Sequence, residues 1–153
     1  MEEILMSVSL DESIGLLSNQ TNRKMLRYVN SELKGYDITL EQWVVLLILG
    51  KENIMNQKQL AEKLEKDQPT LARILDILER KKLIERQSIK EDRRSFLVHI
   101  TTLGRSLKSE VAVFLEADFE KMLFGITEEK IEIYKEVLMQ INYNITNQLQ
   151  EGK

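Results

Sequence analysis

The chain has no cysteine and a single histidine, His99, among its 153 residues. Without cysteine it can form no disulfide, no thiolate nucleophile and no cysteine-ligated zinc site, and it cannot sense oxidants through a thiol. One histidine excludes a His-rich metal site and a two-histidine catalytic centre. The sequence also lacks a phosphate loop and a nucleophile elbow. We therefore expect neither an enzyme nor a bound cofactor or metal.

Proline and glycine are scarce as well, at one and six residues, which favours helices over a many-turned β chain. No apolar run approaches the roughly 18 residues needed to cross a bilayer. The N-terminus begins Met1-Glu2-Glu3 and lacks the basic region of a signal peptide. The expected location is therefore the cytoplasm, with no membrane partner.

Charge is unevenly distributed along the chain. The formal net charge is −3, yet residues 56–108 contain 13 basic and 8 acidic residues. A basic middle between acidic ends is the footprint of a local site for a polyanion such as DNA. A random fluctuation on a solvated surface explains the same charges equally well.

Several helix starts can be located from capping boxes, in which two side chains satisfy free backbone N–H groups reciprocally. These boxes predict helices over 10–34, 40–49 and 57–64, the first two ending at Gly35 and Gly50. The pairs of residues that form them are Ser9 with Glu12, Thr39 with Gln42, and Asn56 with Gln59.

The second half of the chain adds a capped helix, a hairpin and two long helices. Asp67 caps a helix to about Lys81, with Pro69 in its first turn, where a missing N–H costs nothing. Alternating apolar and polar residues predict a hairpin of strands 83–89 and 95–100, with a third short strand at 53–55. Long helices are expected over 101–123, where Thr101 is the cap, and from Thr127 onward.

This order of elements is that of a winged helix-turn-helix. The predicted fold is mainly α with a small β-hairpin wing: a winged helix-turn-helix domain plus a helical dimerisation region. We divide the chain into an N-terminal dimerisation helix (1–35), a DNA-binding module (36–101) and C-terminal dimerisation helices (102–153), all within one intertwined domain.

DNA recognition would use two exposed elements of this module. The N-terminal face of the Asp67-capped helix can reach base edges and phosphates in the major groove. Guanidinium groups at the hairpin tip suit a narrow minor groove, whose potential is negative, and a carboxylate two residues away can orient one of them. The candidates are Gln68, Thr70 and Arg73 on the helix, and Asp92, Arg93 and Arg94 at the tip.

Three sequence stretches resemble the MarR family of bacterial winged helix-turn-helix transcriptional regulators. They are Leu60-Ala61-Glu62-Lys63-Leu64, residues 69–79, and the wing Asp92-Arg93-Arg94-Ser95 followed by Val98-His99-Ile100-Thr101. The resemblance covers residues 9–149. It implies a homodimer that reads a palindromic operator, with Arg94 in the minor groove oriented by Asp92. It also implies phosphate contacts from Asn56 and Gln57.

The chain departs from the family pattern at two turns. Glu65-Lys66 stands where a glycine and an apolar residue are usual, and Lys82 stands where glycine usually precedes the first wing strand. A left-handed conformation at a non-glycine residue costs roughly 1 kcal/mol, which a packed domain tolerates.

Aromatic residues leave two interpretations open. Tyr28, Tyr36 and Trp43 are either core residues or the lining of an effector pocket for a small apolar or aromatic molecule, as the resemblance implies. The apolar stripe of the last helix is either core or a dimer interface. His99 is expected to face solvent from the polar side of a wing strand.

The sequence therefore predicts a DNA-binding transcriptional regulator, a homodimeric repressor that a ligand releases from its operator. The alternatives are a winged-helix module that binds other proteins, or an activator without a small-molecule effector. The operator, the regulated genes and the effector cannot be read from the sequence.

Overall fold

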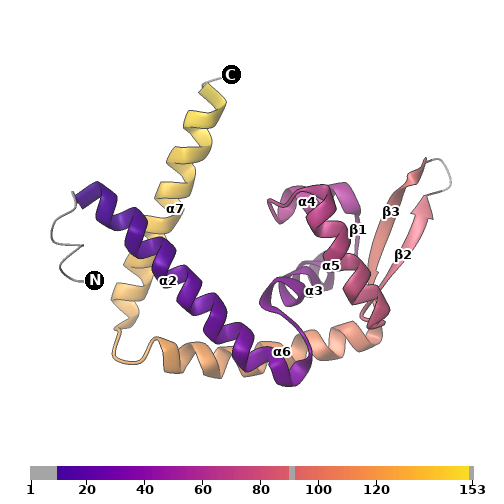
Figure 1. Cartoon of the computed structure of the whole chain (residues 1–153), viewed down its shortest axis with the longest axis horizontal. Helices are drawn as coiled ribbons and strands as arrows, with labels where there is room; N and C mark the ends of the chain where they lie inside the picture. The colour runs from indigo at the N-terminus through magenta and orange to yellow at the C-terminus, as the bar shows by residue number, and fades with distance from the viewer. Residues whose placement is uncertain (1–9, 90–91, 152–153) are drawn as a thin grey trace. The chain divides into compact units, whose positions relative to one another are not determined.

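The structure is a computed structural model that describes residues 10–89 and 92–151, with side chains at 13–88 and 96–148. The chain divides into two compact units, residues 1–116 and residues 117–153. The first unit contains most elements of Figure 1. They are α2 (Leu10–Glu32), the 3-10 helix η1 (Leu33–Tyr36), α3 (Leu40–Glu52), β1 (Ile54–Asn56), α4 (Gln57–Lys63), α5 (Gln68–Arg80), β2 (Ile84–Ile89), β3 (Asp92–Ile100) and most of α6 (Thr102–Met122).

Capping side chains fix the starts of the helices as predicted. Thr39 with Gln42 at α3, and Asn56 with Gln59 at α4, form complete capping boxes. The Asp67 side chain accepts from the backbone N–H of Thr70 at the start of α5. The box expected at Ser9 lies outside the described residues. Local hydrogen bonding therefore determines where α3, α4 and α5 begin.

Two predicted helix ends are wrong. Gly35 lies inside η1, and the left-handed residue that ends this turn is Asp37, with φ of 50°. Gly50 lies inside α3, which continues to Glu52 and is capped by Asn53, where φ is 64°. A Cβ at Gly50 would lie 2.9 Å from the end of the flexible Lys108 side chain on α6, which can move aside.

The sheet has three antiparallel strands in the order β1-β3-β2. Figure 1 shows β2 and β3 as a hairpin. Ile84 pairs with Ile100 at its base, and Ile89 pairs with Asp92 next to its tip. On the other edge of β3, Ile54 pairs with His99 and Asn56 with Leu97. The third strand predicted at 53–55 is thus present and begins one residue later.

The core of the first unit is aliphatic and gathers helices onto this sheet. The leucines on the inner face of α5 are buried. Fully buried side chains come from every layer of the module, namely Val45, Leu46 and Leu49 of α3, Leu60 of α4, Leu71, Leu75 and Leu78 of α5, and Ile84 and Val98 of the sheet. Glu65 and Lys82 adopt φ of 50° and 58°, so the left-handed turns expected without glycine are confirmed.

The second unit consists of the end of α6, a turn and α7 (Glu128–Glu151). Gly125, with φ of 81°, lies in the turn between the two helices. The Thr127 hydroxyl accepts from the N–H of Lys130 at 3.4 Å, which caps α7. Within the described residues, no helix is both long and apolar enough to cross a membrane.

Candidate nucleic-acid interface

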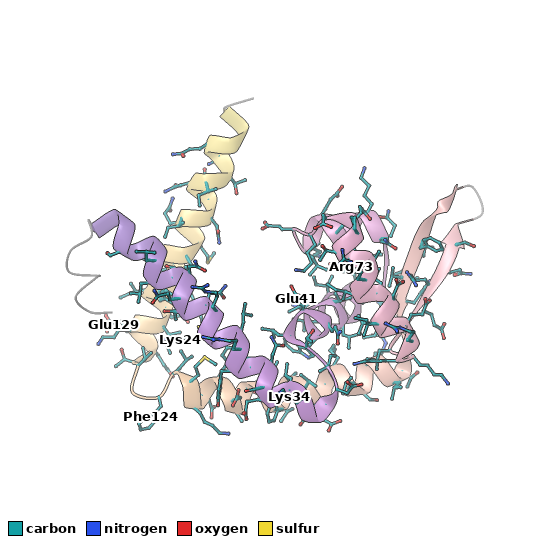
Figure 2. The ribbon with its side chains drawn as sticks, viewed as in Figure 1. Lys24, Lys34, Glu41, Arg73, Phe124 and Glu129 are labelled. Atoms are coloured by element: carbon teal, nitrogen blue, oxygen red, sulfur yellow. The ribbon has the colours of Figure 1, made fainter. Side chains whose placement is uncertain are left out.

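Helix α5 exposes one face of its first two turns, while its other face packs in the core. Gln68 and Arg73 are exposed, and Figure 2 labels Arg73 on this helix. Leu71 and Leu75, on the opposite side, are fully buried. Because buried neighbours fix the rotation of the helix, the exposed side chains have a defined direction, as a major-groove reader requires.

Thr70, the third predicted reader, is engaged within the protein. Its hydroxyl donates to Oδ2 of Asp67 at 2.8 Å, and its backbone N–H donates to Oδ1 at the same distance. These hydrogen bonds lower the pKa of Asp67 below its usual value. In this geometry Thr70 offers DNA its methyl group and the acceptor capacity of its oxygen, because its proton is already donated.

Asn56 and Gln57 stand at the start of α4. The Asn56 side-chain oxygen accepts from the N–H of Gln59 at 2.8 Å, and the Asn56 N–H donates to the Gln59 side chain at 3.2 Å. The Asn56 amide NH₂ group remains as a donor. Both residues are half-buried and sit at the positive end of the helix dipole. Donors at a helix start suit phosphate oxygens.

The wing residues can be placed only by their backbone. Asp92, Arg93 and Arg94 belong to β3, at its hairpin end. Their side chains lie outside the described residues. The expected pairing of Asp92 with Arg94 therefore stays a prediction.

Arg86 joins the wing to α5, a role that was not predicted from the sequence. Its Nη2 lies 2.6 Å from Oε2 of Glu79 and 2.7 Å from Oδ1 of Asp76, and its Nε donates to Oε2 of Glu79 at 3.0 Å. The Arg86 N–H also donates to Glu79 at 3.1 Å. Two carboxylates three residues apart on one helix, followed by an arginine on the next strand, are the signal that could have revealed it.

This cluster, which we call the Arg86 clamp, is charged on both sides. Hydrogen bonds from Arg86 lower the pKa of the Glu79 carboxyl. The Glu79 and Asp76 carboxylates in turn raise the pKa of the Arg86 guanidinium. Charge-assisted, forked hydrogen bonds of this kind fix direction as well as distance. The clamp thus holds β2 at a set position against α5.

Part of the basic charge counted in the sequence is neutralised inside the fold. Lys66 pairs with Glu41 at 2.6 Å, and Lys63 pairs with Glu52. Arg73 forms no ion pair with any described residue. The basic side chain at the start of α5 is therefore available to an external partner.

His99 differs from its expected position. It was predicted to face solvent, yet it is half-buried, and its Nε2 atom is buried with no hydrogen-bond partner among the described residues. The reason is strand order: β3 is central, so His99 lies between Ile54 of β1 and Glu85 of β2. The described residues contain no group of His, Cys, Asp and Glu that could hold a metal ion.

The three aromatic residues that were candidates for an effector pocket have different surroundings in the structure. Tyr36 lines a hollow of about 400 Å³ and packs its ring 5.2 Å from that of Phe114. Trp43 instead donates its indole N–H to the Lys108 carbonyl at 3.1 Å, which ties α3 to α6. Tyr28 is 39% exposed on α2 and does not line this hollow.

Comparison with known proteins agrees with this architecture. The MarR family model matches residues 38–96. A cysteine mutant of MarR from E. coli, solved with operator DNA, is 26% identical, with 88% of this chain and 99% of that chain covered at a TM-score of 0.77. MepR from S. aureus, solved as a DNA complex, is also 26% identical, with 85% and 96% covered at 0.75.

A further structure is similar at lower identity. BpsR from Bordetella bronchiseptica, whose DNA binding is regulated by 6-hydroxynicotinic acid, is 22% identical, with 84% of this chain and 98% of that chain covered at a TM-score of 0.78. At this identity the likeness shows the fold alone. The winged-helix fold and the resemblance drawn from the sequence are confirmed, and the relatives are regulators that bind DNA, not enzymes.

Proposed function

Residues 38–96 belong to the MarR family of DNA-binding regulators, and from this premise we propose that the chain is a homodimeric transcriptional repressor of a palindromic operator. It would act in the cytoplasm, where chromosomal DNA is reached directly. The observation that carries the proposal is the exposed face of the first two turns of α5, where Gln68 is exposed and Arg73 forms no ion pair with any described residue, beside a hairpin wing that Arg86 holds in place.

Each residue has a proposed role in DNA binding. Gln68, Arg73 and the methyl group of Thr70 would read base edges in the major groove, and Asn56 and Gln57 would donate to phosphates. At the wing, Arg94 would enter the minor groove with Asp92 as its partner, and Arg93 would contact the backbone.

Dimerisation is supported by the apolar face of α7. Tyr134, Leu138, Ile141 and Ile145 recur at a 3-4 spacing and are 38–54% exposed in the single chain. A stripe of this kind is the seam of a helical interface. Two copies related by a two-fold axis would present two recognition helices to half-sites about 34 Å apart.

Ligand response is supported by the hollow beside Tyr36. Leu83, Leu103 and Leu107 line it together with Lys81, whose ammonium lies 3.0 Å from Oδ2 of Asp37. An apolar molecule there would touch η1, the end of α5 and the start of α6 at once. A ligand that favours one arrangement of these elements would alter DNA affinity by its differential binding to the two states.

The test is fluorescence anisotropy of the purified chain with duplex DNA from upstream of its own gene, at several salt concentrations. Arg73→Ala is compared with Arg80→Ala, which removes the same charge from the far end of α5. We expect Arg73→Ala to weaken operator binding by about 1–3 kcal/mol and relax sequence preference, and Arg80→Ala to change binding little. Arg94→Ala should weaken binding and lower the salt dependence.

Two results would contradict the proposal. Equal binding of operator and scrambled DNA by every variant, at any salt, would favour a winged-helix module that binds proteins. Operator binding that Arg73→Ala and Arg94→Ala both leave unchanged would move the interface elsewhere on the chain.

A further inference from the structure

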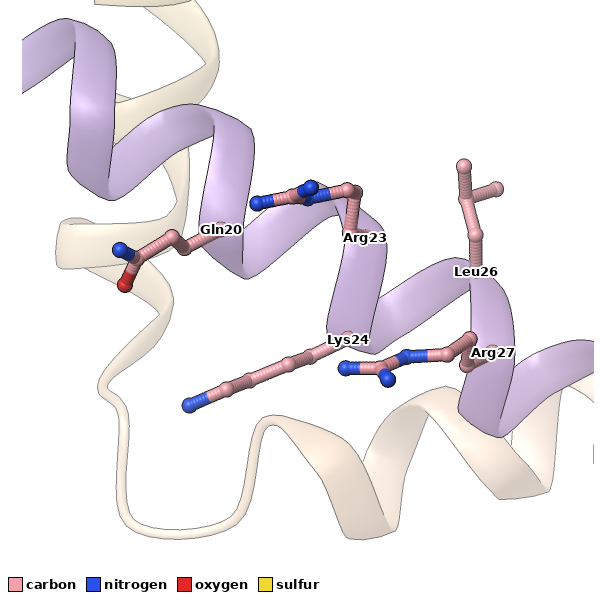
Figure 3. A pocket seen from close by; sticks show the side chains of 5 residues that line it. All are labelled: Gln20, Arg23, Lys24, Leu26 and Arg27. Carbon is pink, nitrogen blue, oxygen red and sulfur yellow. The ribbon is translucent and has the colours of Figure 1, made fainter.

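A stripe of basic side chains runs along α2, away from the elements that would touch DNA. Gln20, Arg23, Lys24 and Arg27 stand at spacings of three and four residues, so they share one face of the helix. Figure 3 shows their side chains around a hollow, with Leu26 at its edge. The three cations are exposed, and Gln20 is half-buried.

Part of the basic charge of the first unit is neutralised within the fold. Lys63, Lys66, Lys81 and Arg86 each lie against a carboxylate. In contrast, none of Arg23, Lys24 and Arg27 forms an ion pair with any residue that the structure describes. Like charges at these spacings repel and weaken the helix, so the stripe carries an unfavourable interaction that an anion would relieve.

The geometry defines the anion. The Cα atoms of Arg23 and Arg27 are separated by about 6 Å along the helix axis, so their long side chains can converge on one small molecule. Guanidinium forks match carboxylate and phosphate oxygens, and the Lys24 ammonium adds a compact charge. Gln20 supplies an amide, and Leu26 supplies an apolar contact. We propose that this face of α2 binds a compact organic polyanion with at least two carboxylate or phosphate groups.

Two other occupants fit less well. A DNA duplex presents a convex ridge of phosphates, which protruding elements reach more readily than a hollow does. A second copy of the chain could offer the acidic start of α7, but there Glu132 is already paired with Lys135 at 2.6 Å, and Lys130 interrupts the acidic residues. The proposal does not depend on operator binding.

The experiment is isothermal titration of the full chain with pyrophosphate and, separately, citrate, each compared with sodium chloride at equal ionic strength. The test variant is Arg23→Gln/Arg27→Gln. The matched control is Lys34→Gln/Lys51→Gln, which removes two charges from exposed sites of the first unit, on η1 and α3. Thermal unfolding in chloride verifies that both variants fold.

We expect saturable binding of at least one probe by the wild type and by the control, and a loss of about tenfold or more in affinity for the test variant. The probe that binds more tightly distinguishes phosphate from carboxylate chemistry. Equal heats in all three proteins, or no saturable binding, would overturn the proposal. A third result would also overturn the proposal: no probe binds the wild type, and the test variant loses affinity for duplex DNA or sediments differently. In that case the stripe would contact DNA or a second copy of the chain.

Discussion

The winged module and helix α7 differ in how far their apolar side chains are buried. In the module, aliphatic side chains from α3, α4, α5 and the sheet enclose one another, and most are below 2% exposed. In α7 the regularly spaced apolar residues remain open, and Tyr134 is 54% exposed. The same 3-4 periodicity therefore produces a self-contained core in one region and an unpartnered face in the other.

Apolar side chains can stabilise a protein in two ways. Burial inside one chain stabilises the fold at any protein concentration, whereas an open apolar face gains free energy only when a partner covers it. The module therefore has the packing needed to hold the proposed DNA-reading side chains in place. Helix α7 has the exposed apolar surface that the proposed dimer would cover.

The largest expected effect comes from placing a charge in the α7 stripe. Ile141→Asp would bury an unpaired carboxylate in the proposed dimer, at a cost of about 3–5 kcal/mol, and should give a monomer. Sedimentation velocity at several protein concentrations measures this. Tyr143→Asp, on the opposite face of α7, should leave the dimer intact.

A core variant sharpens the same contrast. Leu75→Ala empties a fully buried position and should cost about 2–5 kcal/mol. This loss in the free energy of unfolding should be the same at low and high protein concentration, after the free energy of dimer formation has been subtracted. A wild-type chain that stays monomeric at high concentration, with Ile141→Asp equally stable, would refute the role given to α7.

The sequence predicted those features that arise from neighbouring residues. The caps at Thr39, Asn56 and Asp67 are each complete within three residues, so their pattern is visible without the fold. The helix ends predicted at Gly35 and Gly50 are wrong because the positive φ falls on Asp37 and Asn53 instead. Both residues are held by side chains distant in the sequence: Lys81 lies 3.0 Å from Asp37, and Arg105 donates to Asn53 at 2.9 Å. Local signals alone cannot show such contacts.

The candidate site divides in the same way. The exposure of Gln68 and Arg73 on one face of α5 follows from helical periodicity, so it could be predicted from the sequence. The Arg86 clamp and the partial burial of His99 depend on which strands and helices meet, and they were missed or misplaced. Trp43 was grouped with Tyr36, although its indole N–H bonds to a distant carbonyl on α6.

A smaller effect is expected at the Arg86 clamp. Arg86→Gln removes the charge that Glu79 and Asp76 share, and since both carboxylates are partly solvated we expect a loss of about 1 kcal/mol. The variant should also weaken operator binding, because the wing is no longer fixed against α5. Urea unfolding and anisotropy measure the two effects, with Arg80→Gln as the control.

The clamp also has a pH signature. The pKa of Glu79 is lowered in the folded protein from an ordinary value of 4.5, so its contribution to stability is present above that value and is lost as pH falls through the folded pKa. The wild type should therefore lose its advantage over Arg86→Gln as pH falls below about 4.5. Asp67, whose pKa is also lowered, is common to both proteins and cancels in the difference. A stability difference that stays constant down to pH 3 would exclude the clamp as its source.

The smallest expected effect concerns the turn between α4 and α5. Glu65 has φ of 50°, where an L-residue is strained and glycine is not. Glu65→Gly should stabilise the fold by about 0.5 kcal/mol, since relief of that strain exceeds the added entropy of the unfolded chain. Glu62→Gly, an exposed position inside α4, should instead destabilise by about 1 kcal/mol, because glycine is a poor helix former. Urea unfolding of the two variants decides the matter: a loss of stability in both would mean that Glu65 makes contacts that outweigh its backbone strain.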